Sequence, residues 1–176
     1  LHQFGITMKQ LQHKEIPKAE SSLPITILCD GISLPVNIGN IFRLADAFGV
    51  ERIVFAGQKI DVRNRKVKQV SRSTHLWIPY SNITLLPPEI SELKNRGYFI
   101  IALEITDNSQ VIQEVDLSSN QKTALIIGSE HKGISEEVLS LCDKTFHIPI
   151  FGQNTSMNVA NALAVSLYEI SKQISL

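Results

Sequence analysis

KTALIIGSEHKG, residues 122–133, is the stretch that decides the fold of this chain. Its first half, TALIIG at 123–128, has the length and composition of a strand that is buried on both faces. Its second half is a polar turn that leads into a helical pattern. Strands that are apolar throughout occur almost only in parallel sheets covered by helices on both faces. The stretch therefore predicts an α/β protein with a mostly parallel sheet.

Apolar runs and helical patterns alternate on both sides of this stretch. We expect further buried strands at 24–30, 52–57, 98–105 and 144–150, and a weak strand at 75–80. Helices are expected at 38–48, 87–97, 135–141 and 157–174. Residues 59–72 should form a loop or a short helix, and the polar residues 106–121 a surface connection. The helix at 157–174 is apolar on nearly all sides and should need cover from more than one direction.

The length and composition indicate one soluble globular domain. The chain has 176 residues, of which 43% are hydrophobic and 19% charged. No apolar run approaches the roughly 20 residues of a membrane span, and the opening lacks the features of a signal peptide. No repeat or linker interrupts the pattern, so we expect one domain at 24–176 after an amino-terminal extension at 1–23. Leu1 is read as a trimmed start.

The cysteines and histidines favour a reducing compartment without a metal site. Cys29 and Cys142 each lie in an apolar stretch and have no partner at a metal-ligand spacing. We expect both to be buried free thiols, as is usual for unpaired cysteine. The five histidines show no ligand spacing either. A cytoplasmic protein that needs no metal fits this pattern best.

Basic residues are concentrated in one segment, although the net charge of the chain is zero. Residues 59–72 contain six basic residues and one acid, a local charge of +5, so the rest of the chain carries −5. Such a segment would attract a polyanion, while the acidic remainder limits indiscriminate binding. We expect it to bind RNA through Arg63, Arg65, Lys66, Lys68 and Arg72. A solvated surface loop is the alternative.

Three polar blocks lie at or after the ends of apolar runs, at 37–43, 128–133 and 156–158. Ligands of open parallel sheets bind beyond the carboxyl ends of the strands, so these blocks could build one site. The glycines of the second block allow close backbone approach or positive φ. That block matches neither a phosphate-binding GxxxxGK[ST] loop nor a GxGxxG turn. A helix cap is the plainer interpretation of the third block.

Arg43, in the first block, is expected on a mostly apolar helix between Phe42 and Leu44. A guanidinium that is buried in such a position needs anionic or carbonyl partners. A ligand contact and a structural ion pair both remain open for it.

Together the blocks resemble motifs of the SPOUT superfamily, and specifically its TrmH-like RNA ribose 2′-O-methyltransferases. The matching patterns are N-x-G-N-x-x-R at 37–43, I-G-S-E-x-K-G at 127–133 and I-P-x-x-G-x-x-x-S-x-N at 148–158. The resemblance covers residues 24–174. It implies a trefoil knot near the carboxyl end, which is an exception to the rule that chains do not thread their loops. It also implies a homodimer whose active sites are completed across the interface.

The resemblance implies a role for individual residues. Arg43 corresponds to the residue that activates the ribose hydroxyl, and Asn37 to its support. The other catalytic positions are Glu130, Ser156 and Asn158. S-adenosylmethionine would be bound mainly through backbone groups around Leu103, Gly128, Ile148 and Met157. The family often has leucine at the position of Met157, a swap between apolar residues of similar size.

The expected reaction is methylation of a ribose 2′-hydroxyl of RNA. A hydroxyl is a poor nucleophile until it loses its proton. Arginine normally stays protonated, so we expect Arg43 to bind a phosphate and stabilise the developing alkoxide, with the proton acceptor left open. Larger relatives carry a separate RNA-binding domain before the catalytic domain, whereas only a short extension is expected here. We therefore expect tRNA rather than rRNA as substrate, as in the compact relatives. A non-catalytic RNA-binding descendant and a base methyltransferase are the alternatives.

Overall fold

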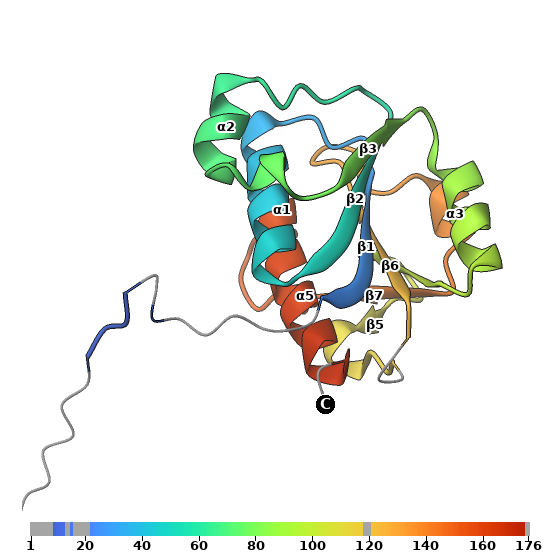
Figure 1. Ribbon diagram of the computed structural model, residues 1–176. Coiled ribbons are helices and arrows are strands. Elements are labelled where there is room, and N and C mark those ends of the chain that lie inside the picture. Colours follow the sequence, from blue (N-terminus) through green and yellow to red (C-terminus); the bar gives the residue numbers. More distant parts are fainter. Residues whose placement is uncertain (1–8, 13–14, 16–21, 118–120, 175–176) are drawn as a thin grey trace, which may run out of the picture.

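The chain forms a twisted parallel sheet between two layers of helices (Figure 1). A computed structural model describes residues 9–12, 15, 22–117 and 121–174. In this part of the chain seven strands follow the order β3-β2-β1-β6-β4-β7-β5, and every neighbouring pair is parallel. The strands are β1 (Leu23–Asp30), β2 (Val50–Ala56), β3 (Tyr80–Ile83), β4 (Phe99–Leu103), β5 (Gln110–Val111), β6 (Thr123–Gly128) and β7 (Lys144–His147).

Helices cover both faces of the sheet, as predicted. On one face lie α1 (Pro35–Ala47), α2 (Arg65–Ser71) and α5 (Val159–Ile174), and on the other α3 (Leu86–Asn95) and α4 (Glu136–Leu139). Short 3₁₀ helices occur at η1 (Thr74–Leu76) and η2 (Ile112–Glu114). Side chains alternate between two apolar cores, so Ile27 packs under α1 and α5 while Leu28 packs under α3.

The central strand β6 is buried at all six positions and pairs with β1 and β4. It coincides with the apolar run predicted at 123–128. The predicted trefoil knot agrees with this strand order, and it stays a prediction. Among the described residues no helix has the length and apolar character that a membrane span requires.

Two sequence predictions are wrong. The weak strand at 75–80 is instead η1 followed by β3, because side chains in this segment bond locally to Ser71. Thr74 Oγ1 donates to the Ser71 carbonyl at 2.8 Å, and His75 Nδ1 lies 2.6 Å from Ser71 Oγ. The connection at 106–121 contains β5 and η2, and its Ile112, Val115 and Leu117 are buried in the core.

Gly39, in the first polar block, has a packing role. A Cβ atom at this position would lie 2.7 Å from Val70 Cβ, on α2. Glycine therefore allows the basic helix α2 to pack closely against α1. This contact fixes the position of the basic segment relative to the first block.

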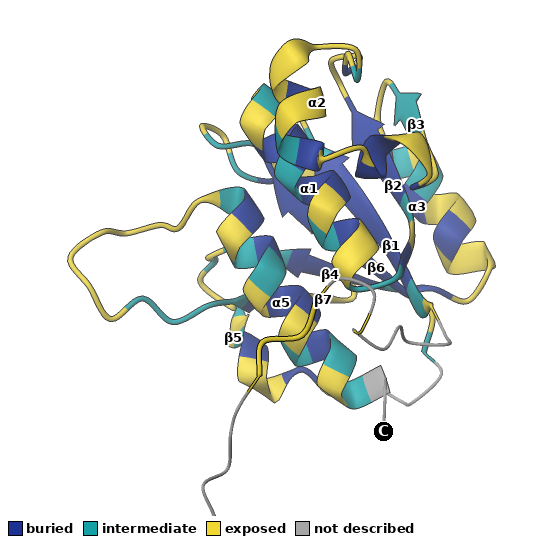
Figure 2. Ribbon diagram, turned by 60° about the vertical axis from the view of Figure 1, so that its left-hand side comes forward, coloured by how far each residue is buried: buried dark blue, intermediate teal, exposed yellow. Residues whose placement is uncertain are grey.

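Helix α5 is covered on one side only. Figure 2 shows that buried and exposed positions alternate along α5. Leu163, Leu167 and Ile170 are buried, whereas Val165 and Tyr168 are 38% and 58% exposed. The sequence predicts cover from more than one direction, and a single chain leaves the outer side open.

The predicted extension at 1–23 lies largely outside the described residues. Leu23 is the first residue of β1 and pairs with Val50, so the sheet begins one residue earlier than the predicted boundary. The division into an extension and a catalytic domain stays a prediction.

Candidate active site

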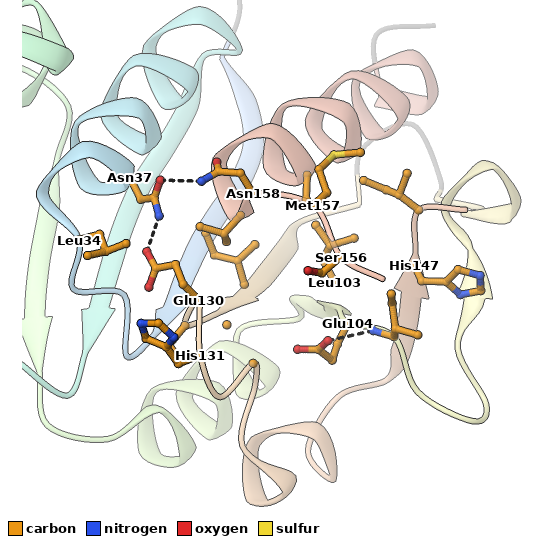
Figure 3. Close-up of a pocket in the computed structure, with 18 of the residues that line it drawn as sticks. Leu34, Asn37, Leu103, Glu104, Glu130, His131, His147, Ser156, Met157 and Asn158 are labelled. Carbon is orange, nitrogen blue, oxygen red and sulfur yellow. Dashed lines mark hydrogen bonds between the residues drawn. The ribbon is translucent and has the colours of Figure 1, made fainter. Parts of the chain in front are cut away.

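A cavity of about 700 Å³ opens beyond the carboxyl ends of β4, β6 and β7 (Figure 3). This volume is in the usual range for sites that bind a small organic ligand. The predicted positions that line the cavity are Asn37, Leu103, Gly128, Glu130, Ile148, Ser156, Met157 and Asn158. Residues from all three polar blocks thus meet where ligands of parallel sheets bind.

A chain of hydrogen bonds joins the three blocks through Asn37, at the start of α1. The Asn37 side chain is only 2% exposed. Its Nδ2 donates to Glu130 Oε1, and its Oδ1 accepts from Asn158 Nδ2 at 3.1 Å (Figure 3). A buried amide needs such partners, and here each partner comes from a different block. The contact fixes the Glu130 carboxylate at the cavity wall.

Asn158 also caps α5. Its Oδ1 accepts from the backbone N–H groups of Ala160 at 3.0 Å and Asn161 at 3.3 Å. The predicted helix cap is therefore present, and the same side chain supplies the amide that reaches Asn37. One residue thus ties the start of α5 to the first and second blocks.

We expect Asn37→Ala to lower the free energy of unfolding by about 1–3 kcal/mol, because Glu130 and Asn158 each lose a partner at a part-buried site. Urea denaturation followed by circular dichroism measures this change. Asn95→Ala, at an exposed position at the end of α3, is the matched control and should stay near the wild-type value. Equal values for the two variants would contradict the role given to Asn37.

The turn after β6 requires glycine at both of its ends. Ser129 and Gly133 exchange two backbone hydrogen bonds, of 3.0 and 3.1 Å. A Cβ at Gly128 would overlap the carbonyl carbon of Gly133 and the nitrogen of Ile134. Gly133 has φ of +65°, which glycine adopts at little cost. Close backbone approach and positive φ, predicted from the sequence, are both confirmed.

Sequence reasoning missed Glu104, which follows β4 directly and lines the cavity. Glu104 Oε2 accepts from the Ile134 N–H at 3.0 Å, and a Cβ at Gly133 would overlap this oxygen. The Glu104 carboxylate thus stabilises the end of the glycine turn through the backbone N–H of Ile134. Its place after a buried parallel strand was the signal that could have found it.

His131, in the glycine turn, and His147, at the end of β7, also line the cavity, and neither was predicted to be part of the site. His147, at the end of β7, has its Nδ1 2.9 Å from Ser109 Oγ. Its ring points away from the other labelled lining residues (Figure 3), so His147 borders the cavity without turning its imidazole into it. The nearby wall is apolar at Leu103, Ile148 and Met157. In the described part of the chain, no group of three or more metal-ligating side chains is placed to hold a metal ion.

Arg43 differs from the sequence expectation, because it is exposed and does not line the cavity. The burial of Phe42 does not extend to Arg43, since neighbours in a helix point in directions about 100° apart. Within the described residues Arg43 forms no side-chain hydrogen bond or ion pair. Among the residues that the structure describes, Arg43 therefore has no partner in a structural ion pair, and its exposed position suits contact with a ligand.

The predicted RNA-binding residues are all exposed and lie on or beside α2. Asn64 caps this helix by accepting from the Lys66 N–H at 2.8 Å. Arg63 bonds to Asp61 at 3.5 Å, and both of these side chains are well exposed. The segment thus presents its positive charge to solvent, on the face of the sheet that carries α1.

Both cysteines are free thiols, as predicted, but only Cys29 is buried, whereas Cys142 is partly exposed. Burial, and to a lesser extent the charge of Glu130, raises the pKa of the Cys29 thiol well above its usual value. Burial, followed by the charge of Asp143, raises the pKa of Cys142 to about 12. Neither thiol is ionised near neutral pH, so neither is a nucleophile for this site.

The chain is similar to RNA methyltransferases of the SpoU and TrmH families. The model of the SpoU rRNA Methylase family matches residues 24–168. A putative TrmH family tRNA/rRNA methyltransferase of Staphylococcus saprophyticus is 31% identical over 156 residues, which are 89% of this chain and 61% of that protein. The chain thus spans about three fifths of the length of this relative.

Two solved structures share the fold and more than a quarter of the aligned residues. The SpoU methyltransferase AviRb from Streptomyces viridochromogenes, in complex with the cofactor AdoMet, has a TM-score of 0.76 and 30% identity over 94% of this chain and 66% of that one. The A. aeolicus TrmH/SpoU tRNA modifying enzyme has a TM-score of 0.76 and 28% identity over 86% of this chain and 76% of that one.

Proposed function

The chain belongs to the SpoU rRNA methylase family, and we propose that it transfers a methyl group from S-adenosylmethionine to a ribose 2′-hydroxyl of RNA. The observation that carries the proposal is the hydrogen-bond chain from Asn158 through Asn37 to Glu130 at the cavity wall. It assembles all three motifs of the TrmH-like enzymes at one site.

The cavity fits S-adenosylmethionine by shape and by chemistry. Leu103, Ile148 and Met157 give an apolar wall for an aromatic base, and the bare backbone at Gly128 allows close approach. Glu104 adds a carboxylate that can accept from hydroxyl or ammonium groups. When bound, S-adenosylmethionine supplies a methyl group activated by a positively charged sulfur.

The residues of the chain have to bind the ribose and weaken its O–H bond. We assign this task to Arg43, since a guanidinium is positively charged and can bind a neighbouring phosphate. Its charge stabilises the negative charge that develops on the hydroxyl oxygen. Glu130 and Ser156 orient the substrate, and Asn37 holds Glu130 in position.

Arg43 is absent from the cavity of its own chain, and we therefore propose that a second copy completes the site. Exposed apolar side chains lie near the cavity and along α5, as a contact between copies requires. They are Leu34, Val36, Phe151, Met157, Val165 and Tyr168. A symmetric dimer that covers them would bring Arg43 of each copy toward the cavity of the other.

The basic segment is proposed to hold the RNA through phosphate contacts. We expect Lys66→Ala combined with Lys68→Ala to weaken RNA binding and to flatten its salt dependence, by about one unit of slope for each lost contact. Fluorescence anisotropy with labelled tRNA at several salt concentrations measures both. Lys122→Ala with Lys144→Ala, at the amino ends of β6 and β7, removes the same charge and should leave the slope unchanged. Equal slopes for the two double variants would contradict an RNA contact at α2.

We propose tRNA as the first substrate to test and the cytoplasm as the compartment. A similar solved structure is described as a tRNA modifying enzyme, and free thiols suit a reducing compartment. The test is incubation of the protein with methyl-labelled S-adenosylmethionine and either tRNA or rRNA transcripts. Label in tRNA is expected. Label in rRNA alone would move the substrate to rRNA, and label in neither, with the cofactor bound, would indicate a non-catalytic RNA-binding protein.

A further inference from the structure

Trp77, the only tryptophan of the chain, is held in an exposed position. Its side chain is 56% exposed, and the preceding Leu76 is 74% exposed. The indole Nε1 donates to Asp46 Oδ1, on α1, at 2.7 Å. A large aromatic ring is thus fixed in orientation while much of it remains open to solvent. The proposed reaction, as described so far, gives this ring no role.

The segment that carries Trp77 is held by local contacts. Arg72 and Ser73 have φ of 48° and 73°, in the left-handed region that is costly for residues other than glycine. Buried hydrogen bonds join Ser71 to Thr74 and to His75, and they hold the backbone on both sides of Arg72 and Ser73. The arrangement therefore presents Trp77 at little further cost in conformational entropy, which favours binding.

Basic residues lie on the elements next to the one that carries Trp77. The basic segment 59–72 ends five residues before it, and both α2 and η1 pack against α1. Arg43 lies three residues before Asp46 on α1, so the two are neighbours on the helix surface. The acid of this pair is occupied by the indole N–H. An exposed aromatic ring among phosphate-binding side chains is the usual arrangement for stacking an unpaired base.

We propose that Trp77 stacks on an unpaired base of the RNA, close to the nucleotide whose ribose is methylated. The inference rests on the proposed function, since it names the part of the RNA that this surface recognises. Arg43 would contact the target nucleotide, and Trp77, which is bonded to Asp46 about one helical turn after Arg43 on α1, would hold a nearby base. The substrate is therefore expected to present its target in a loop or another unpaired region.

Because Trp77 is the only tryptophan, the fluorescence of the wild-type protein reports on this contact directly. We expect a short oligoadenylate to quench the emission over the same concentration range in which anisotropy shows binding. An abasic ribose-phosphate oligomer of the same length should bind through its charge without this quenching. Binding of oligoadenylate with unchanged emission would overturn the inference. Quenching that follows protein concentration without RNA would also overturn it, because a second copy would then cover Trp77.

Variants distinguish base stacking by Trp77 from a purely structural role, in which its bond to Asp46 holds η1 against α1. Trp77→Ala should weaken oligoadenylate binding about 5- to 150-fold, whereas Trp77→Phe should keep most of the affinity. Leu85→Ala, at a position 62% exposed before α3, is the matched control and should bind normally. A lower melting temperature for Trp77→Ala with unchanged RNA affinity would show that Trp77 has only a structural role. Wild-type protein that binds no RNA even at low salt would instead contradict the proposed function, and the inference with it.

Discussion

Arg43→Ala is expected to lower the rate of methyl transfer by about 100- to 1,000-fold, the usual loss when one group that stabilises the transition state is removed. Affinity for S-adenosylmethionine should stay unchanged, because the proposed partners of Arg43 are the phosphate and ribose of the RNA and not the cofactor. Methyl incorporation under single-turnover conditions and calorimetric titration with the cofactor measure the two quantities separately. Folding should be unaffected, since the side chain is exposed and forms no side-chain hydrogen bond or ion pair within the described residues.

Arg96→Ala is the control for this variant, since Arg96 is an exposed arginine at the opposite end of the sheet, after α3. It should retain wild-type activity. Undiminished turnover by Arg43→Ala would remove the activating role from Arg43. A loss of cofactor affinity equal to the loss in rate would place Arg43 in the binding site rather than in the chemistry.

Mixing two impaired variants tests whether Arg43 acts on the partner's cavity, at a cofactor concentration that saturates the wild type but lies well below the dissociation constant of Gly128→Ala. Subunits with Arg43→Ala are combined with subunits that carry Gly128→Ala, whose own cavity is damaged. Half of the randomly formed dimers are mixed, and each mixed dimer has one intact site, so about a quarter of the wild-type activity should return. No recovery in a mixture that exchanges subunits would show that Arg43 acts within its own chain, or that the protein works as a monomer.

Gly128→Ala is expected to raise the dissociation constant for S-adenosylmethionine at least about tenfold, since overpacking of this kind commonly costs 1–3 kcal/mol. The new Cβ would overlap backbone atoms of Gly133 and Ile134, so the turn that carries Glu130 has to move. Its movement would distort the cavity wall and the contact with Asn37. Calorimetric titration with S-adenosylmethionine and S-adenosylhomocysteine measures the loss.

Gly97→Ala is the control for Gly128→Ala. Gly97 has φ of +79° and open space around it, and it lies before β4 at the end of the sheet away from the cavity. Alanine there should cost about 1–2 kcal/mol of stability through backbone strain and leave cofactor affinity intact. If both variants lose affinity in proportion to their stability, the effect of Gly128 is not specific to the site.

Much of the fold was predictable because strands that are buried in a parallel sheet appear in the sequence as continuous apolar runs. The strand at 123–128 matches β6 residue for residue, and the helix predicted from the two prolines matches α3 within two residues at its end. The resemblance to TrmH-like enzymes is confirmed by the family match over residues 24–168. Three ordered motifs carried more information than any one of them alone.

The errors have local causes. Residues 75–80 have the composition of a strand, but side-chain hydrogen bonds to Ser71 favour a 3₁₀ turn at the start of this segment. Such bonds depend on conformation and leave no periodic pattern in the sequence. At 106–121 the few apolar residues, such as Ile112, occupy a core position that only the neighbouring α5 makes available. Polar composition thus concealed a buried contact.

The candidate site was predictable at its three blocks and not at Arg43. The helical period already separates Arg43 from the buried stripe of Ile38, Ile41, Phe42 and Ala45. Reasoning from the adjacent residues Phe42 and Leu44 ignored this period and gave a buried guanidinium. Glu104 shows the converse, because a residue outside every motif became part of the site through its place at a strand end.

The central claim is that the methyl group goes to a ribose oxygen, and nucleoside analysis of the product tests it most directly. RNA methylated by the purified protein is digested to nucleosides and separated by liquid chromatography with mass spectrometry. We predict a single 2′-O-methylated nucleoside that is absent from RNA treated with Arg43→Ala. A nucleoside methylated on its base would contradict the assignment of Arg43 to the ribose hydroxyl.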